Sequence, residues 1–292
     1  MNFKDGYSTI NDVPIYYKYF ESKGASKTLV VLHGGPGATH DMDLPLAELS
    51  DRGISVFFYD QYGCGKSGET PDYPSRFTTE YYMDELEQLR RSVLEGRKIY
   101  VMGHSWGGML GLAYATKHQD QMHALISTGG ISSVPFYTNE VNTWIEALPD
   151  ELKQAIHKYE RLGDYSNPEY LKAVDYFYHE HLLRLKDWPP EMYIGMKSID
   201  ERKVYKTWWG PNEFRATGKL KDWDITSEIE VIRIPTLVTT STYDEVSPNV
   251  AKLIQKHIPG SRLVQFQNSS HCPMWEEREE YLKTLETFIK EN

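Results

Sequence analysis

The segment Gly103-His104-Ser105-Trp106-Gly107 constrains the fold of this chain more than any other feature of its sequence. An apolar, β-prone stretch precedes it at residues 98–102, and a helix-like stretch follows at residues 108–115. A serine in such a strand-to-helix turn has its hydroxyl exposed above the sheet edge, over a helix N-terminus. The flanking glycines suit a crowded turn in which a Cβ would clash with backbone. We therefore predict that Ser105 is a nucleophile and not a residue of an ordinary turn.

Short β-prone runs alternate with helical stretches on both sides of this turn. The β-prone runs cover a hairpin-like segment at residues 7–20 and the later segments 29–32, 54–59, 98–102, 123–127, 235–240 and 263–266. Apolar residues at helical spacing, Leu86, Leu89, Val93 and Leu94, lie before the turn. Continuous apolar strands that alternate with helices are typical of a parallel sheet covered on both faces. The sequence therefore predicts an α/β fold with a mostly parallel central sheet.

Residues 133–224 break this alternation. They lack a clear strand pattern, they are rich in aromatic residues, and Pro189-Pro190 and Gly210-Pro211 punctuate their helical stretches. Strand-like sequence returns afterwards with the strands that the sheet still needs, which favours an insertion over an independent second domain. We predict an α/β core made of residues 1–132 and 225–292, with a helical cap, residues 133–224, inserted between its two parts.

Two residues late in the chain complete a catalytic constellation with Ser105. A serine hydroxyl needs a base to take its proton, and the base needs an acid to orient it. Asp244 and His271 each follow one of the last two apolar runs, so both lie at the carboxyl ends of predicted strands, where open α/β sheets place their sites. The chain order Ser, Asp, His also fits this turn. We predict His271 as the general base and then acid, and Asp244 as the residue that holds its tautomer.

Acyl transfer also needs hydrogen-bond donors for the developing oxyanion. The backbone N–H of Trp106, directly after the nucleophile at the start of a helix, is the first predicted donor. The second is predicted in the run His33-Gly34-Gly35-Pro36-Gly37, because a glycine-rich loop lets backbone N–H groups approach a substrate closely. Within this run Gly35 is the first choice and Gly37 is the alternative.

The remaining histidines and the two cysteines predict no metal site. His104 flanks the nucleophile, but its side chain should point away from the position of a base, and we interpret it as a packing residue. His179 and His181 lack a third ligand at a recognisable spacing, so packing in the cap is the preferred interpretation. Cys64 and Cys272 show neither CxxC nor metal-like spacing, which favours a reducing, cytoplasmic setting. We expect no metal and no cofactor.

Charge and hydropathy exclude further classes of function. The formal net charge is -10 at pH 7, which disfavours nucleic acid and anionic membrane surfaces as partners. No apolar run approaches the roughly 18 residues that span a bilayer. The first residues also lack the basic-then-apolar pattern of a signal peptide. We expect a cytoplasmic protein with no nucleic-acid or membrane partner.

Three motifs together resemble those of the prolyl aminopeptidases, or proline iminopeptidases, of the α/β-hydrolase fold. They are His33-Gly-Gly-Pro-Gly37, Asp60-Gln61-x-Gly63-x-Gly65-x-Ser67 and Gly103-His-Ser-Trp-Gly-Gly108. The resemblance extends along essentially the whole chain and is strongest to an archaeal, tricorn-interacting branch, through residues 176–184, 210–214 and 243–246. It implies an α/β-hydrolase fold and a serine aminopeptidase that removes one N-terminal residue, often proline, from short peptides. It also implies the tricorn protease as a partner.

In that family two acidic groups bind the α-ammonium of the substrate, and the matching residues here are Glu213 and Glu245. A buried ammonium needs anionic or acceptor partners to offset its desolvation. Two carboxylates at a fixed distance from the nucleophile would therefore admit only acyl groups that carry a free amine. Typical bacterial members have arginine where this chain has Tyr62, which argues against a strict preference for proline. An aromatic-lined cap would suit proline or bulky apolar first residues.

Two other functions could use the same residues. An esterase, lactonase or amino-acid amidase with this triad would hydrolyse esters that lack an amine, and it would hardly need Glu213 or Glu245. A ligand receptor on this fold would show slow single turnover and a cap that shifts on binding. Epoxide hydrolases and haloalkane dehalogenases generally place an aspartate where this chain has Ser105, so both are disfavoured. An aminopeptidase is the leading hypothesis.

Overall fold

A sheet of eight strands forms the centre of the molecule in the computed structural model, which describes residues 2–71 and 73–292. The strands are β1 (Lys4–Ile10), β2 (Val13–Phe20), β3 (Thr28–Leu32), β4 (Ser55–Tyr59), β5 (Ile99–His104), β6 (Met122–Thr128), β7 (Thr236–Ser241) and β8 (Arg262–Phe266). Their order across the sheet is β1-β2-β4-β3-β5-β6-β7-β8. β2 pairs antiparallel with β1 and β4, and all other pairs are parallel. The predicted α/β fold with a mostly parallel sheet is confirmed.

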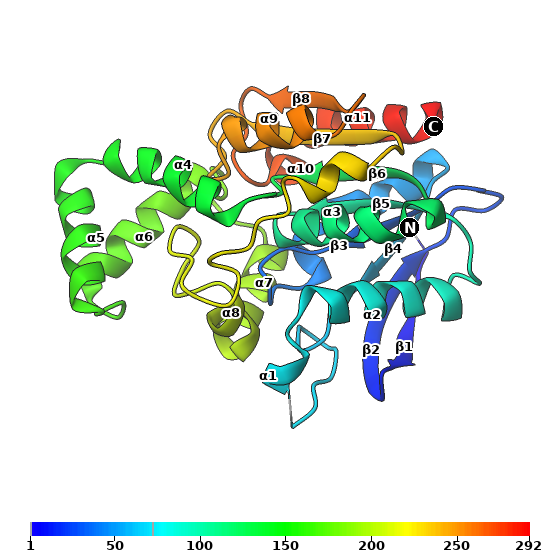
Figure 1. Ribbon diagram of the computed structural model, residues 1–292, viewed down its shortest axis with the longest axis horizontal. Helices are drawn as coiled ribbons and strands as arrows, with labels where there is room; N and C mark the ends of the chain where they lie inside the picture. The colour runs from blue at the N-terminus through cyan, green and yellow to red at the C-terminus, as the bar shows by residue number, and fades with distance from the viewer. Residues whose placement is uncertain (1, 72) are drawn as a thin grey trace.

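Helices cover both faces of this sheet (Figure 1). The helices are η1 (His40–Arg52), α1 (Tyr73–Arg76), α2 (Thr79–Ser92), α3 (Trp106–His118), η2 (Gln119–Gln121), α4 (Val134–Glu146), α5 (Asp150–Leu162), α6 (Pro168–His181), α7 (Pro190–Glu201), α8 (Lys203–Trp208), η3 (Glu228–Val231), α9 (Pro248–His257), α10 (Pro273–Glu276) and α11 (Arg278–Glu291). α2, α3 and α9 pack on one face, and η1 and α11 pack on the other. The central strands β3, β4 and β5 are buried along their whole length, which explains their continuous apolar sequences.

The parallel strands carry the loops that follow them to one edge of the sheet. β3 and β5 run in register, with Val30 beside Val101 and Leu32 beside Gly103. The loops after β3, β5, β7 and β8 therefore start from the same edge. This edge is where an open α/β sheet forms its binding crevice.

The five helices α4 to α8 lie between β6 and β7 in the chain. Figure 1 shows α5 and α6 as a hairpin that extends away from the sheet, at the left of the view. α7 instead packs against η1 of the core. The two ends of the segment meet, because Ser133 and Asp224 form an antiparallel bridge and Ser133 Oγ donates to the Asp224 carboxylate at 2.7 Å. The segment thus leaves and re-enters the core at one point.

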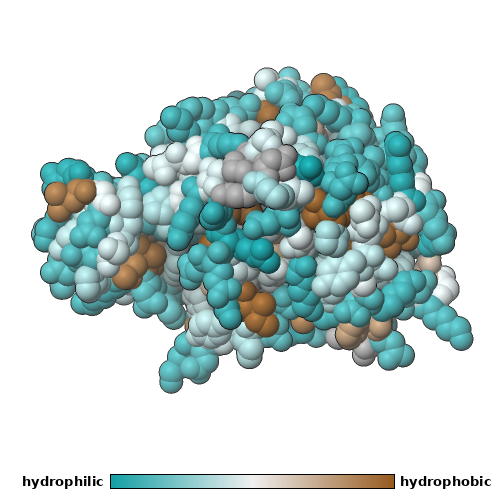
Figure 2. Space-filling model, turned by 90° about the horizontal axis from the view of Figure 1, so that it is seen from below, coloured by the Kyte–Doolittle hydropathy of each residue, from teal (hydrophilic) through white to brown (hydrophobic). Residues whose placement is uncertain are grey.

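The face of the molecule shown in Figure 2 is largely hydrophilic, with small separate hydrophobic spots. Exposed apolar side chains on the outer cap helices include Leu162 and Leu171. Scattered apolar residues of this kind are normal on a protein surface. Among the described residues, no helix has the length and apolar character needed to cross a bilayer.

Two glycines allow the start of α3 to lie close to the central strands. A Cβ on Gly103 would lie 2.0 Å from Gly107 O, and a Cβ on Gly107 would lie 1.9 Å from Leu32 O. Both obstacles are backbone atoms, so no side-chain rotation could relieve the overlap. The turn between β5 and α3 therefore requires glycine at both positions.

We expect Gly107→Ala to lower the free energy of unfolding by about 3 kcal/mol or more, because the backbone of β3 would have to move. Gly6→Ala is the matched control: its Cβ would meet only the side chain of Tyr17, at 3.4 Å. For this control we expect a change within about 0.5 kcal/mol. Urea unfolding followed by circular dichroism measures both variants. A Gly107→Ala protein as stable as the wild type would contradict the tight turn described above.

Candidate active site

Ser105 lies in the turn between β5 and α3 with φ 55 and ψ -121. A positive φ is uncommon for a residue with a side chain and costs free energy, so the surrounding packing must enforce it. The Ser105 N–H donates to Thr128 O at 2.9 Å. Gly34 flanks the serine, because a Cβ there would lie 3.1 Å from Ser105 Cβ. The structure thus places the predicted nucleophile on a strained turn next to the glycine-rich loop.

His271 and Asp244 meet on the loops that follow β8 and β7. His271 Nδ1 donates to Asp244 Oδ1 at 2.7 Å, and the same oxygen accepts from Val246 N at 2.8 Å. Since an ionised carboxylate only accepts hydrogen bonds, Nδ1 carries the proton and Nε2 is left as the basic atom. Nε2 has no hydrogen-bond partner among the described residues. Ser105 and His271 line the same cavity, and catalytic hydrogen bonds often tighten only when substrate binds.

The two predicted oxyanion donors come from separate loops at this cavity. Gly35 lines the cavity and has φ +107, a conformation that favours glycine. Trp106 is the first residue of α3, where backbone N–H groups have no helical acceptor. Neither N–H donates to a backbone carbonyl within the described residues. The N–H of Gly37, the alternative, hydrogen-bonds to the Cys64 thiol; Gly35 and Trp106 stay the predicted donors.

Gln61 connects the two loops that carry these donors. Its Nε2 donates to His33 O at 3.0 Å, and its Oε1 accepts from Trp106 Nε1 at 2.8 Å. His33 Nε2 accepts from the Gln61 N–H at 3.0 Å, and His33 Nδ1 lies 2.9 Å from Gly34 O. This pattern requires a neutral His33 with its proton on Nδ1, and burial accordingly lowers the pKa of His33. The Gln61 amide thus fixes the distance between the nucleophile turn and the glycine-rich loop.

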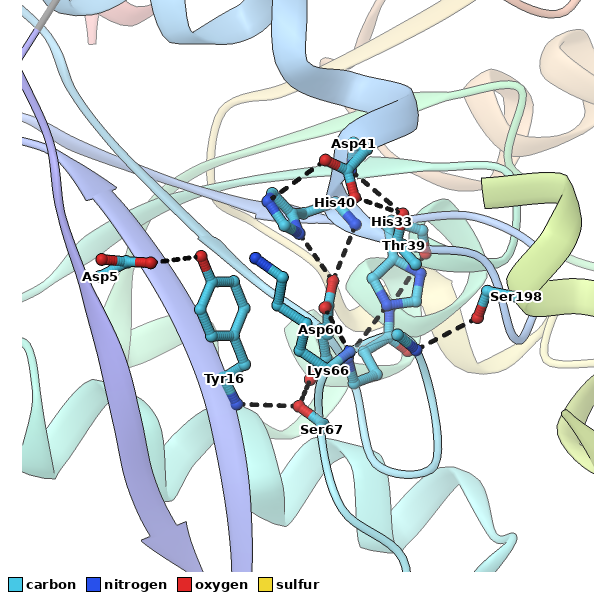
Figure 3. A network of polar contacts seen from close by, with 12 residues as sticks. Asp5, Tyr16, His33, Thr39, His40, Asp41, Asp60, Lys66, Ser67 and Ser198 are labelled. Carbon is cyan, nitrogen blue, oxygen red and sulfur yellow. Dashed lines mark hydrogen bonds and ion pairs between the residues drawn. The ribbon is translucent and has the colours of Figure 1, made fainter. Parts of the chain in front are cut away.

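Asp60 bonds to His40, at the start of η1, and to the loop after β4 (Figure 3). Its carboxylate accepts from His40 N at 3.0 Å, from His40 Nδ1 at 2.7 Å and from Lys66 N at 2.9 Å. Burial alone would raise the pKa of Asp60, but these hydrogen bonds and the positive potential around them hold it below its usual range. The ionised Asp60 therefore joins the loop after β3 to the loop after β4.

Glu213 and Glu245 are both buried, with 8% and 1% of their surface exposed. Glu213 lines the cavity from the loop after α8, and its carbonyl accepts from Tyr137 OH at 3.0 Å. Glu245 Oε1 lies 3.7 Å from His271 Nε2. Burial raises the pKa of Glu213 to about 7. The pKa of Glu245 is raised well above its usual range, chiefly by burial and further by the neighbouring carboxylates of Glu213 and Asp244. In the described part of the chain neither pairs with lysine or arginine, so a cationic ligand would stabilise both.

Comparisons with known proteins agree with this geometry. The alpha/beta hydrolase fold family matches residues 27–278. The chain is 49% identical over 289 residues to the proline iminopeptidase of Saccharolobus solfataricus, covering 99% of this chain and 93% of that protein. The chain belongs to the proline iminopeptidase family.

Further members of the proline iminopeptidase family show the same likeness. The proline iminopeptidase of Thermoplasma volcanium is 47% identical over 289 residues, which cover 99% of this chain and 97% of that protein. The crystal structure of a proline iminopeptidase from Mycobacterium smegmatis has a TM-score of 0.92 and 29% identity, and the match covers 99% of this chain and 98% of that one. The α/β-hydrolase fold and the family predicted from the motifs are both confirmed.

The cavity beside Ser105 is small in this member of the proline iminopeptidase family. Its free volume is about 20 Å³, which is about the space of one water molecule. Its apolar lining consists of Met42, Leu182, Met196 and Ile199. The expected aromatic lining is therefore wrong: Trp209 packs against Tyr137 within residues 133–224, with ring centroids 5.6 Å apart, and Trp208 packs against Trp106 of the core, at 4.8 Å.

His181, the last residue of α6, has a role that its sequence context did not predict. Its carbonyl accepts from Glu245 N and from His271 N, each at 3.2 Å, and its Nδ1 donates to Tyr243 O at 2.9 Å. The cap thereby holds both loops that carry the predicted acid and base. No sequence signal could have revealed this, because the acceptor is a backbone carbonyl. His179 lies on the cap surface, stacked on Trp188, and no cluster of possible metal ligands occurs within residues 2–71 and 73–292.

The raised pKa of Glu213 predicts a stability that falls as pH rises. A carboxyl whose pKa rises on folding from 4.5 to about 7 binds more protons in the folded than in the unfolded chain, so stability is lost between these two pH values. We expect the Glu213→Gln variant to show no such loss. At pH 8 its free energy of unfolding should exceed that of the wild type by on the order of 1–3 kcal/mol. The difference should vanish near pH 5.

Thermal unfolding at pH 5 and pH 8 measures this effect. Glu151→Gln, on the solvent face of α5, is the matched control, because Glu151 has a side chain that is 84% exposed. We expect no pH-dependent difference from the wild type for this variant. The same difference between Glu213→Gln and the wild type at both pH values would contradict the assignment of a protonated, buried Glu213.

Proposed function

We propose that this chain is a serine aminopeptidase that releases the N-terminal residue of short peptides through an acyl-enzyme on Ser105. The observation that carries the proposal is the pair of buried carboxyls, Glu213 and Glu245, beside Ser105 and His271 at a small cavity. An α-ammonium bound by the two carboxyls would present the adjacent carbonyl to the serine. The relatives at 49% and 47% identity, both proline iminopeptidases, support proline among the residues released.

The proposed reaction uses each group in turn. Ser105 Oγ attacks the carbonyl carbon of the first peptide bond, His271 Nε2 takes its proton, and Asp244 stabilises the resulting imidazolium. The imidazolium then protonates the leaving amine, and the shortened peptide departs. Water, activated by the same Nε2, hydrolyses the acyl-enzyme and releases the amino acid. The N–H groups of Gly35 and Trp106 stabilise the oxyanion in both steps.

Residues 133–224 serve in this proposal as a cap that opens and closes over the substrate. The bridge between Ser133 and Asp224 supports it, since both ends of the cap join the core at one place. The aliphatic and thioether lining supports a preference for proline and other apolar first residues. Methionine side chains adapt to different shapes, which favours a broad preference.

The proposed setting is the cytoplasm, with short peptides as substrates. Two free, buried cysteines, Cys64 and Cys272, support a reducing compartment. A partnership with the tricorn protease is supported only by the resemblance of the cap and its neighbouring loops.

Blocking the substrate amine tests the proposed function. We expect N-acetylation of prolyl and alanyl fluorogenic amides to lower kcat/KM by about 10³-fold or more, because Glu213 and Glu245 would lose their cationic partner. Glu245→Gln should lower kcat/KM for the free-amine substrates by about 10²-fold. Glu151→Gln should change neither the effect of acetylation nor kcat/KM for the free-amine substrates.

Equal cleavage of free and acetylated substrates would reassign the protein to the esterases or amidases. Binding with a single slow turnover and no steady-state rate would instead favour a ligand receptor. Either result would overturn the proposal.

Substrate binding should also release a proton. Below pH 7 the raised pKa of Glu213 keeps this carboxyl protonated, and an arriving ammonium favours its ionised form. We expect the inactive Ser105→Ala variant to release about one proton when it binds the dipeptide Pro-Ala at pH 6. At pH 8.5 it should release clearly less than one proton. Calorimetry in buffers of different ionisation enthalpy measures this release. A binding heat that does not depend on the buffer at pH 6 would contradict the predicted role of Glu213.

A further inference from the structure

His104, the residue before the predicted nucleophile, is buried between two hydrogen-bond acceptors. Its Nε2 lies 3.0 Å from His271 O, and its Nδ1 lies 3.0 Å from Asp43 Oδ1. A carbonyl oxygen and a carboxylate oxygen both only accept, so each ring nitrogen must carry a proton to make a favourable contact. An imidazole with two N–H groups is a cation. The contacts therefore indicate a charged His104, where the sequence suggested only packing.

Asp43 gives independent support for this charge. It lies in η1, it is 0% exposed, and within the described residues its oxygens have no donor nearby other than His104 Nδ1. An uncompensated buried carboxylate is strongly unfavourable, so the nearby His104 supplies the balancing charge. Burial alone would lower the pKa of His104, but the charge of Asp43 raises it above its ordinary value.

The charge of His104 lies next to the proposed catalytic base. The ring centroids of His104 and His271 are 4.8 Å apart. Acidic groups also surround His271: Asp244 Oδ1 lies at 2.7 Å from its Nδ1, and Glu245 Oε1 lies at 3.7 Å from its Nε2. A charged His104 repels a second positive charge on the neighbouring ring.

We propose that His104 is a positioning residue that stays protonated, holds the His271 backbone through Nε2–H and places a positive charge beside the proposed base. The proposal rests on the proposed function, in which His271 is the base. The charged groups that face this pair include Asp43 from η1, Asp244 and Glu245 from the loop after β7, and Glu213 from the cap. Burial raises the pKa of the Cys272 thiol, which directly follows His271 and stays neutral. The four carboxyl groups are acidic, so His104 provides the opposing charge.

Nitrogen-15 spectra of the histidine side chains in the wild-type protein test the charge directly. We expect both ring nitrogens of His104 to show the shifts of protonated nitrogens from pH 6 to pH 8, with the signals assigned by their loss in His104→Gln. A His104 ring with one unprotonated nitrogen at pH 7 would overturn the proposal. This measurement needs no substrate, so its failure is distinct from a failure of the proposed peptidase activity.

The pH profile of kcat at saturating free-amine substrate tests the consequence. This profile reports the pKa of the base in the bound complex, where the substrate ammonium occupies Glu213 and Glu245. We expect His104→Gln to raise the acidic limb by about one pH unit. His118→Gln, at the C-terminal end of α3 and away from the cavity, should leave the acidic limb in place. An unmoved limb in folded His104→Gln would overturn the proposal.

Asp43→Asn provides a second test that does not depend on the folding of His104→Gln. Without its anionic partner, His104 should lose a proton with a pKa near or below the ordinary histidine value. The nitrogen-15 spectra should then show the change from the charged to the neutral ring between pH 6 and pH 8. A His104 that stays fully protonated at pH 8 in this variant would contradict the pairing with Asp43.

Discussion

The close contact between the nucleophile turn and β3 determines the rest of this site. Gly107 approaches Leu32 O so closely that a Cβ would lie 1.9 Å from it. Leu32 immediately precedes the glycine-rich loop, so one contact fixes both the serine and the second predicted oxyanion donor. Gln61 reinforces this arrangement, because its amide bonds to His33 and Trp106 at once. The chemistry thus depends on backbone atoms that only glycine allows to approach.

Charge in a buried space is the second constraint. Asp43, Asp244, Glu213 and Glu245 are all buried near one another, and each ionised carboxylate needs a partner. His271 and His104 serve the two aspartates. The two glutamates pair with no lysine or arginine in the described part of the chain and have raised pKa values, so their burial lowers the stability of the free protein at neutral pH.

Much of this arrangement follows from sequence patterns that a parallel sheet imposes. Continuous apolar runs mark the buried strands, and residues just past them must gather at one edge, which is why Asp244 and His271 were predictable. The pairing of Asp43 with His104 was not predictable from the sequence. The two residues lie 61 positions apart, and only the packing of η1 beneath the turn brings them together. The aliphatic cavity lining also escaped prediction. Composition showed that the cap is aromatic, but the fold decides which side chains face inward.

The carbonyl of His181 makes the alignment of the loops around His271 and Glu245 depend on the position of the cap. In the proposed opening of the cap, both loops would lose this backbone acceptor, and the reacting groups would be less ordered. Alignment would return only around a substrate small enough to be enclosed. A folded protein would exceed that limit, so its size alone would protect it from this proposed cleavage.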